Sequence, residues 1–138
     1  MLTEACVLDT SVASCAWDDH NKNHSQVRQW LANIPDALIY ICPVTLGEVE
    51  YGLNVSRTMD LQRQNAIRAA TKTYRLLSID RHTHEPYARI RAALFQSFAP
   101  RAARNKRRAS YVEDLVERTS GKEMGIQEND LWIVAVAV

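Results

Sequence analysis

With 138 residues, the chain is long enough for one domain with a hydrophobic core and too short for two. Hydrophobic residues make up 46% and charged residues 24% of the sequence, and the net charge is +1. This composition is typical of a globular protein and excludes a disordered chain. No run approaches the ~20 apolar residues that cross a bilayer, and residues 1–4 lack the basic region of a secretory signal. We therefore expect a cytoplasmic protein without a membrane span.

The opening stretch Cys-Val-Leu-Asp-Thr-Ser-Val, residues 6–12, places a carboxylate directly after apolar residues. The apolar residues are typical of the end of a short buried strand, and Thr10 or Ser11 is a suitable cap for a following helix. Asp9 is then expected at the carboxyl end of a strand, where ligands and catalytic groups collect in an α/β sheet. On this stretch alone the simpler interpretation is that Asp9 caps the helix, because Asp is among the best caps.

The remaining chain alternates between helical and strand patterns. Helical periodicity and turn residues predict helices at residues 12–17, 25–32, 45–53, 59–75, 82–98 and 111–118. Short apolar runs predict further strands at residues 38–42 and 76–80. Thr45 is the expected cap of the third helix, which puts Glu48 in its first turn. Strands separated by helices indicate the α/β class, with a parallel sheet and crossover helices.

The last segment, residues 125–138, is ambiguous by pattern. Its β-branched residues favour a strand, whereas Asn129 or Asp130 at the start of an apolar run equally suits the beginning of a buried helix. The three cysteines, Cys6, Cys15 and Cys42, form no C-x-x-C pair, and their odd number favours reduced thiols over a disulfide framework.

Three stretches together resemble the PIN-domain family, in particular the VapC-type toxins of bacterial toxin–antitoxin pairs. They are V-L-D-T-S-V at residues 7–12, E-V-E-Y-G at residues 48–52 with its E-x-x-x-G spacing, and N-D-L-W-I at residues 129–133. Each motif is weak alone. Their order and their surroundings fit the family from one end of the chain to the other, and the first two have the strand-to-helix context.

The resemblance implies a single PIN-like domain over residues 1–138, a three-layer α/β/α sandwich with a central parallel sheet. Asp9, Glu48 and Asp130 match the first, second and third family carboxylates, which are catalytic and bind Mg²⁺ or Mn²⁺ at one end of the sheet. The implied activity is an endoribonuclease on single-stranded RNA that acts as a toxin. The implied partners are the RNA substrate, a second copy of the chain in a homodimer, and a cognate antitoxin that inserts a segment near the acidic pocket. The family resemblance also makes the last segment a helix.

The sequence departs from the family after the third acid. Family members continue into another strand, a further acidic residue and usually a last strand, whereas this sequence stops at Val138. We therefore expect the fourth acidic position and the last strands to be missing, and the opening strand to be left without cover on one side. A fragment, a truncated gene product, or an edge supplied by a partner each accounts for this.

The three carboxylates Asp9, Glu48 and Asp130 suit the hydrolysis of a phosphodiester bond. A cluster of bare carboxylates repels an anionic phosphate, but oxygen ligands from Asp and Glu hold a hard divalent cation, which neutralises phosphate charge and lowers the pKa of a bound water. Thr10 and Ser11 are interpreted either as helix caps or as hydrogen-bonding groups around the metal's water shell.

Two other functions fit the same residues. A catalytically incomplete PIN remnant would be an RNA- or protein-binding module without metal-dependent cleavage, and a DNA-acting nuclease of the same fold would differ in its substrate. The basic segment from Arg101 to Arg108 is either a contact for RNA phosphates or a solvated loop. The histidines do not have the surroundings of a zinc site. Trp17, Trp30 and Trp132 are expected in the core.

Overall fold

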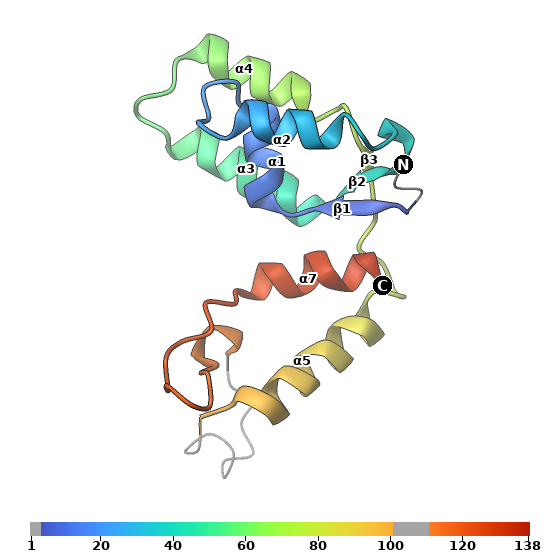
Figure 1. Cartoon of the computed structure of the whole chain (residues 1–138), viewed down its shortest axis with the longest axis vertical. Helices are drawn as coiled ribbons and strands as arrows, with labels where there is room; N and C mark the ends of the chain where they lie inside the picture. The colour runs from blue at the N-terminus through green and yellow to red at the C-terminus, as the bar shows by residue number, and fades with distance from the viewer. Residues whose placement is uncertain (1–3, 101–110) are drawn as a thin grey trace. The chain divides into compact units, whose positions relative to one another are not determined.

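The chain divides into two compact units, Met1–Ser78 and Ile79–Val138, each with its own hydrophobic core (Figure 1). The computed structural model describes residues 4–100 and 111–138. The described strands belong to the first unit, and the second unit is built from helices and the loops between them. None of the described helices is both long and apolar enough to cross a membrane.

The sheet of the first unit contains three short parallel strands. They are β1 (Cys6–Leu8), β2 (Ile39–Ile41) and β3 (Arg75–Leu76), in the order β1-β2-β3. Leu8 pairs with Ile41 and Ile41 pairs with Leu76, so the carboxyl ends of the strands lie in register at one edge. The predicted parallel sheet and α/β class are confirmed. Within the described part of the chain β1 pairs with β2 alone and forms one edge of the sheet.

The third strand is shorter than the sequence predicts. The backbone N–H of Leu77 donates the last bond to the sheet, to the carbonyl of Ile41 at 2.8 Å. Beyond it, the backbone N–H of Asp80 donates to the Thr83 hydroxyl at 3.1 Å, and the Asp80 carboxylate accepts from the N–H of His82 at 2.8 Å. These local bonds form a turn and replace sheet pairing, as Asp and Thr side chains commonly do.

Helices of the first unit pack together and against the sheet, and α1 contacts α2, α3, α4 and β1. The helices are α1 (Thr10–Trp17), α2 (His24–Leu31), α3 (Pro43–Val55) and α4 (Leu61–Ala70), with a single 3-10 turn, η1 (Asp36–Leu38), before β2. Their buried side chains form one core with the strands: Leu8, Ala13, Ala16, Trp17, Leu31, Ile34, Ile39, Ile41, Val49, Leu53, Ile67 and Tyr74. Burial of these apolar side chains is the main stabilising contribution to this unit.

The start of α3 corrects one prediction. The helix begins at Pro43 with Cys42 as its N-cap, and Thr45 is a fully buried helical residue rather than the cap. Proline suits the first helical position because a backbone N–H at that position has no partner within the helix, so proline's lack of an N–H costs no hydrogen bond. Since the helix starts two residues before the predicted first residue, Glu48 lies in its second turn rather than its first.

The three tryptophans differ in their surroundings. Trp17 is buried in the first core and stacks with Tyr74, as predicted. Trp30 is 48% exposed, and its predicted place in the core is wrong. Leu31 and Val27 of the same helix take the inward positions, which turns Trp30 outward. Trp132 is half-buried in the second unit.

An ion pair joins the end of α1 to the start of α4. Two of the three guanidinium nitrogens of Arg63 donate to the Asp18 carboxylate, Nε to Oδ1 at 2.9 Å and Nη2 to Oδ2 at 2.7 Å. These bonds from Arg63 hold the pKa of Asp18 below its ordinary value of 3.8. A lowered folded-state pKa means that this stabilisation is fully present above pH 3.8 and is lost as the pH falls through the folded-state pKa.

Replacing Asp18 with asparagine is therefore expected to lower the free energy of unfolding at neutral pH by about 1–2 kcal/mol. The difference between the variant and the wild type should shrink as the pH falls below 3.8 and through the lowered folded-state pKa of Asp18. Urea unfolding at several pH values measures it, with Asp19→Asn, whose side chain is 76% exposed, as the control. A stability difference that stays constant with pH would show that the ion pair between Asp18 and Arg63 does not cause it.

Over residues 79–100 and 111–138, the second unit packs two α-helices around its own core. They are α5 (His84–Phe98) and α7 (Glu128–Ala137), with a single 3-10 turn, η2 (Val112–Asp114), between them. The buried core residues are Ala99, Val112, Leu115 and Leu131. The helical interpretation of the last segment is confirmed. Leu131, Ile133 and Ala135 are buried on α7, and Leu131 belongs to the core beside α5, a helix contact that propensity alone does not reveal.

The predicted helix at residues 111–118 is wrong. Helical structure ends after η2, and Leu115 takes an extended conformation. Val116 pairs with Glu123 in an isolated antiparallel bridge. The turn between them contains Gly121 at φ 70°, a left-handed conformation that glycine adopts readily. Val112 and Leu115, two of the apolar positions that suggested a helix, are buried in the core of the second unit without a helix that continues through residue 118.

Candidate active site

Asp9 lies where β1 ends and α1 begins. It directly follows Leu8, the last strand residue, and its Oδ1 accepts a hydrogen bond from the backbone N–H of Val12 at 2.9 Å. Asp9 is therefore itself the N-cap of α1, and neither Thr10 nor Ser11 has that role. The cap orients the carboxylate at the carboxyl edge of the sheet and leaves the side chain exposed. The predicted position at the strand end is correct.

Glu48 is brought to the same place by the parallel pairing of β1 with β2. The chain leaves β2 directly into α3, and the second turn of α3 carries Glu48. The hydroxyl of Thr10, the residue after Asp9, donates a hydrogen bond to the Glu48 carboxylate. Two of the three predicted site residues thus lie at neighbouring positions, connected through Thr10.

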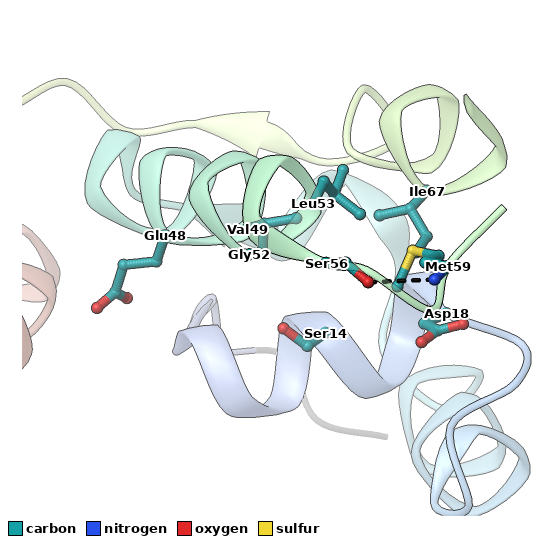
Figure 2. A pocket seen from close by; sticks show the side chains of 9 residues that line it. All are labelled: Ser14, Asp18, Glu48, Val49, Gly52, Leu53, Ser56, Met59 and Ile67. Carbon is teal, nitrogen blue, oxygen red and sulfur yellow. Dashed lines mark hydrogen bonds between the residues drawn. The ribbon is translucent and has the colours of Figure 1, made fainter. Parts of the chain in front are cut away.

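A pocket of about 240 Å³ opens beside Glu48 (Figure 2). Figure 2 shows Glu48 at one end of its lining and Asp18 at the other, with Ser14 of α1 between them. Apolar side chains of α3 and α4 form the opposite wall. Both oxygens of Asp18 accept from Arg63. The pocket therefore combines an apolar wall, the hydroxyls of Ser14 and Ser56, and the Glu48 carboxylate at its end.

Gly52, the glycine of the E-x-x-x-G spacing, lies in this lining. Apart from its chain neighbours and the backbone of its own helix, no atom of the described residues lies within 4 Å of the Cβ that an alanine would add. Gly52→Ala is expected to raise the free energy of unfolding by about 0.5–1 kcal/mol, because glycine in a helix costs backbone entropy. Urea unfolding measures this.

Gly121→Ala is the matched control, since its φ of 70° is strained for alanine. It should lower the free energy of unfolding by about 1–2 kcal/mol. If both substitutions change stability in the same direction, the interpretation of Gly52 is wrong.

Asp130 is a residue of the first turn of α7, in the second unit. Its Oδ2 accepts a hydrogen bond from the backbone N–H of Gln127 at 2.8 Å, the N-cap of the helix. A second carboxylate, that of Glu113, accepts from the backbone N–H of Glu128 at 2.9 Å. Both carboxylates satisfy N–H groups that a helix start leaves without partners. The bond from Glu128 holds the pKa of Glu113 below its ordinary value.

No sequence pattern predicted the group of side chains around Glu128. The Tyr87 hydroxyl donates to the Glu128 carboxylate, and the Tyr87 ring stacks on Trp132. Burial, and then the bond with Glu128, raise the pKa of Tyr87. The four-residue spacing of Glu128 and Trp132 places them on one helix face. Nothing local in the sequence identifies Tyr87 as their neighbour, because it lies 41 residues before Glu128.

Other features of the described residues add no second site. Ligand atoms of Asp18, Asp19 and His20 lie within 4.8 Å of one another, but Arg63 already occupies both Asp18 oxygens. All three cysteines are free thiols, as predicted. The basic segment proposed to contact RNA lies outside the described residues.

Comparisons with known proteins give a family and a fold. The model of the PIN domain matches residues 6–138. VapBC2 from Rickettsia felis, solved bound to a DNA fragment from their promoter, is similar with a TM-score of 0.61 and 20% identity, over 96% of this chain and 78% of that one. FitAcB from Neisseria gonorrhoeae gives a TM-score of 0.60 and 21% identity, over 95% of this chain and 78% of that one. No curated protein sequence matches the chain.

A parallel sheet with two carboxylates at its carboxyl edge defines an α/β protein with an acidic site at the strand ends. The chain belongs to the PIN-domain family, since the family model spans residues 6–138 and so covers parts of both units. The likeness to the solved structures confirms the PIN-like fold.

Proposed function

We propose that this protein is a metal-dependent endoribonuclease of the VapC toxin type, which cleaves phosphodiester bonds of single-stranded RNA. Asp9, Glu48 and Asp130 are the proposed catalytic carboxylates and ligands of Mg²⁺ or Mn²⁺. Membership of the PIN-domain family supports the proposal, as does the likeness in fold to VapBC2 and FitAcB.

The observation that carries the proposal is the hydrogen bond from Thr10 to Glu48. It connects the second family carboxylate to the residue that follows the first, at the edge where β1 and β2 both end. Side chains 38 residues apart have no local reason to meet. Their meeting at a strand end is what a site assembled from distant carboxylates requires.

The donor set fits a hard divalent cation. Mg²⁺ and Mn²⁺ prefer carboxylate oxygens and keep several water ligands, and each proposed ligand is a carboxylate. The Val12 N–H orients the Asp9 carboxylate and the Thr10 hydroxyl orients that of Glu48, so neither side chain depends on the cation for its direction. When bound, the cation would neutralise phosphate charge and lower the pKa of an attacking water.

The direct test is cleavage of a labelled single-stranded RNA by the purified chain, with Mg²⁺ or Mn²⁺ and then with excess EDTA. We expect cleavage with metal and none after chelation. A single-stranded DNA of the same base sequence should stay intact, and its cleavage would favour the DNA-acting nuclease. RNA binding without cleavage would favour the catalytically incomplete binding module. Either of these results contradicts the proposal.

We propose that the partner is a cognate antitoxin that inserts a segment into the pocket beside Glu48. The pocket offers such a segment an apolar wall and a carboxylate at one end. We expect a small antitoxin gene beside the gene of this chain, and its purified product should inhibit cleavage. Gly52→Trp, which fills the pocket, should weaken its binding, whereas Gly47→Ala on the same helix should not. Equal binding to both variants would exclude this pocket.

A homodimer is the proposed assembly. Sedimentation equilibrium should report twice the mass of one chain at micromolar concentration. A species with the mass of a single chain, in a sample that cleaves RNA, would show that the active form is a monomer.

A further inference from the structure

Tyr87 joins α5 to the first two turns of α7. Its hydroxyl donates to the carboxylate of Glu128, and its ring stacks on Trp132 with centroids 3.9 Å apart and planes 9° apart. Arg91 lies one turn further along α5. Its Nη1 donates to the Tyr87 hydroxyl at 2.8 Å and lies 3.8 Å from Glu128 Oε1. One aromatic side chain thus makes a polar and an apolar contact with the same helix.

These two contacts fall on one face of α7 and leave Asp130 on the other. Because an α-helix turns about 100° per residue, Glu128 and Trp132 share a face and Asp130, midway between them, points about 180° away. Glu113, which lies on neither helix, accepts a hydrogen bond from the backbone N–H of Glu128. The beginning of α7 is therefore held against rotation and against sliding along its axis.

We propose that Tyr87 is a positioning residue for Asp130: by bonding Glu128 and stacking on Trp132, it sets the direction in which α7 presents that carboxylate. The inference rests on the proposed metal site. Ligand groups must be held within about 0.5 Å of the productive geometry, and residues that orient ligands typically contribute 10–100-fold to metal affinity. Tyr87 itself touches neither metal nor substrate in this role.

Mn²⁺ affinity measured by isothermal titration tests the role without relying on turnover. Tyr87→Phe keeps the ring and removes the hydroxyl, so the fold should persist by circular dichroism while Mn²⁺ binds about tenfold more weakly. Tyr111→Phe, whose side chain is exposed in the same unit, should bind Mn²⁺ like the wild type. Glu128→Gln keeps an oxygen that accepts from Tyr87, and it should retain most of the affinity.

The outcomes separate positioning from the alternatives. If Asp130→Asn loses Mn²⁺ affinity but Tyr87→Phe does not, Tyr87 has no positioning role, and the proposed function stands. If Glu128→Gln loses as much affinity as Asp130→Asn, Glu128 is itself a ligand and the positioning proposal is wrong. If the wild type binds no Mn²⁺, the metal site fails, and the proposal that rests on it fails too.

Discussion

Replacing Asp9 with asparagine is expected to slow metal-dependent cleavage of single-stranded RNA by about 10²–10³-fold, since a catalytic metal contributes several kcal/mol to the transition state. Asparagine caps helices as well as aspartate does, and its amide oxygen accepts the same bond from the Val12 N–H. The variant should therefore unfold within about 0.5 kcal/mol of the wild type. Cleavage rates and urea unfolding, measured together, separate loss of charge from loss of fold.

The same reasoning applies to the other two carboxylates. In Glu48→Gln an amide oxygen still accepts from Thr10, and in Asp130→Asn an amide oxygen still accepts from Gln127. Each variant should lose activity by a similar factor and keep its stability. Cleavage at the wild-type rate in any of the three would remove that residue from the proposed site.

Glu50→Gln is the matched control for Glu48. Glu50 lies two residues along the same helix, and its carboxylate pairs with Arg68, which holds its pKa below the ordinary value. Since its side chain is 49% exposed, its replacement should leave the cleavage rate within about twofold of the wild type. A large loss in this control would indicate that charge on α3, rather than the Glu48 position, controls activity.

Ile39→Ala is expected to cost about 3–4 kcal/mol of the free energy of unfolding. Ile39 is 0% exposed on β2, the middle strand, and its side chain belongs to the core of the first unit. Truncation loses the transfer free energy of the removed carbons and leaves a cavity that a close-packed core only partly fills. Since small domains are stable by about 5–15 kcal/mol, this is a large fraction of the total. Urea unfolding followed by circular dichroism measures the loss.

Leu61→Ala provides the comparison at an exposed position. Leu61 is 67% exposed at the first residue of α4, and its truncation should change the free energy of unfolding by no more than about 0.5 kcal/mol. Equal losses for Ile39→Ala and Leu61→Ala would mean that the first unit is not organised around β2.

Apolar periodicity predicted the strand before Asp9 and the strand that leads into α3 because burial of one face imposes a local pattern. It also predicted most of α5, whose apolar positions recur at helical spacing. The same rule misled at residues 111–118. There Val112 and Leu115 are buried in the core of the second unit from a segment that is not an α-helix, and the turn that follows contains Gly121 in a left-handed conformation.

The sequence by itself determined the order of the three carboxylates and the strand-to-helix setting of Asp9 and Glu48, because strand, helix and motif are written in neighbouring residues. Only the tertiary structure decided three hydrogen bonds: from Thr10 to Glu48, from Arg63 to Asp18, and from Tyr87 to Glu128 of α7. The partners in these bonds are 38, 45 and 41 residues apart. The packing of whole helices and strands selects pairings at such separations. A local pattern of residues carries no information about that packing.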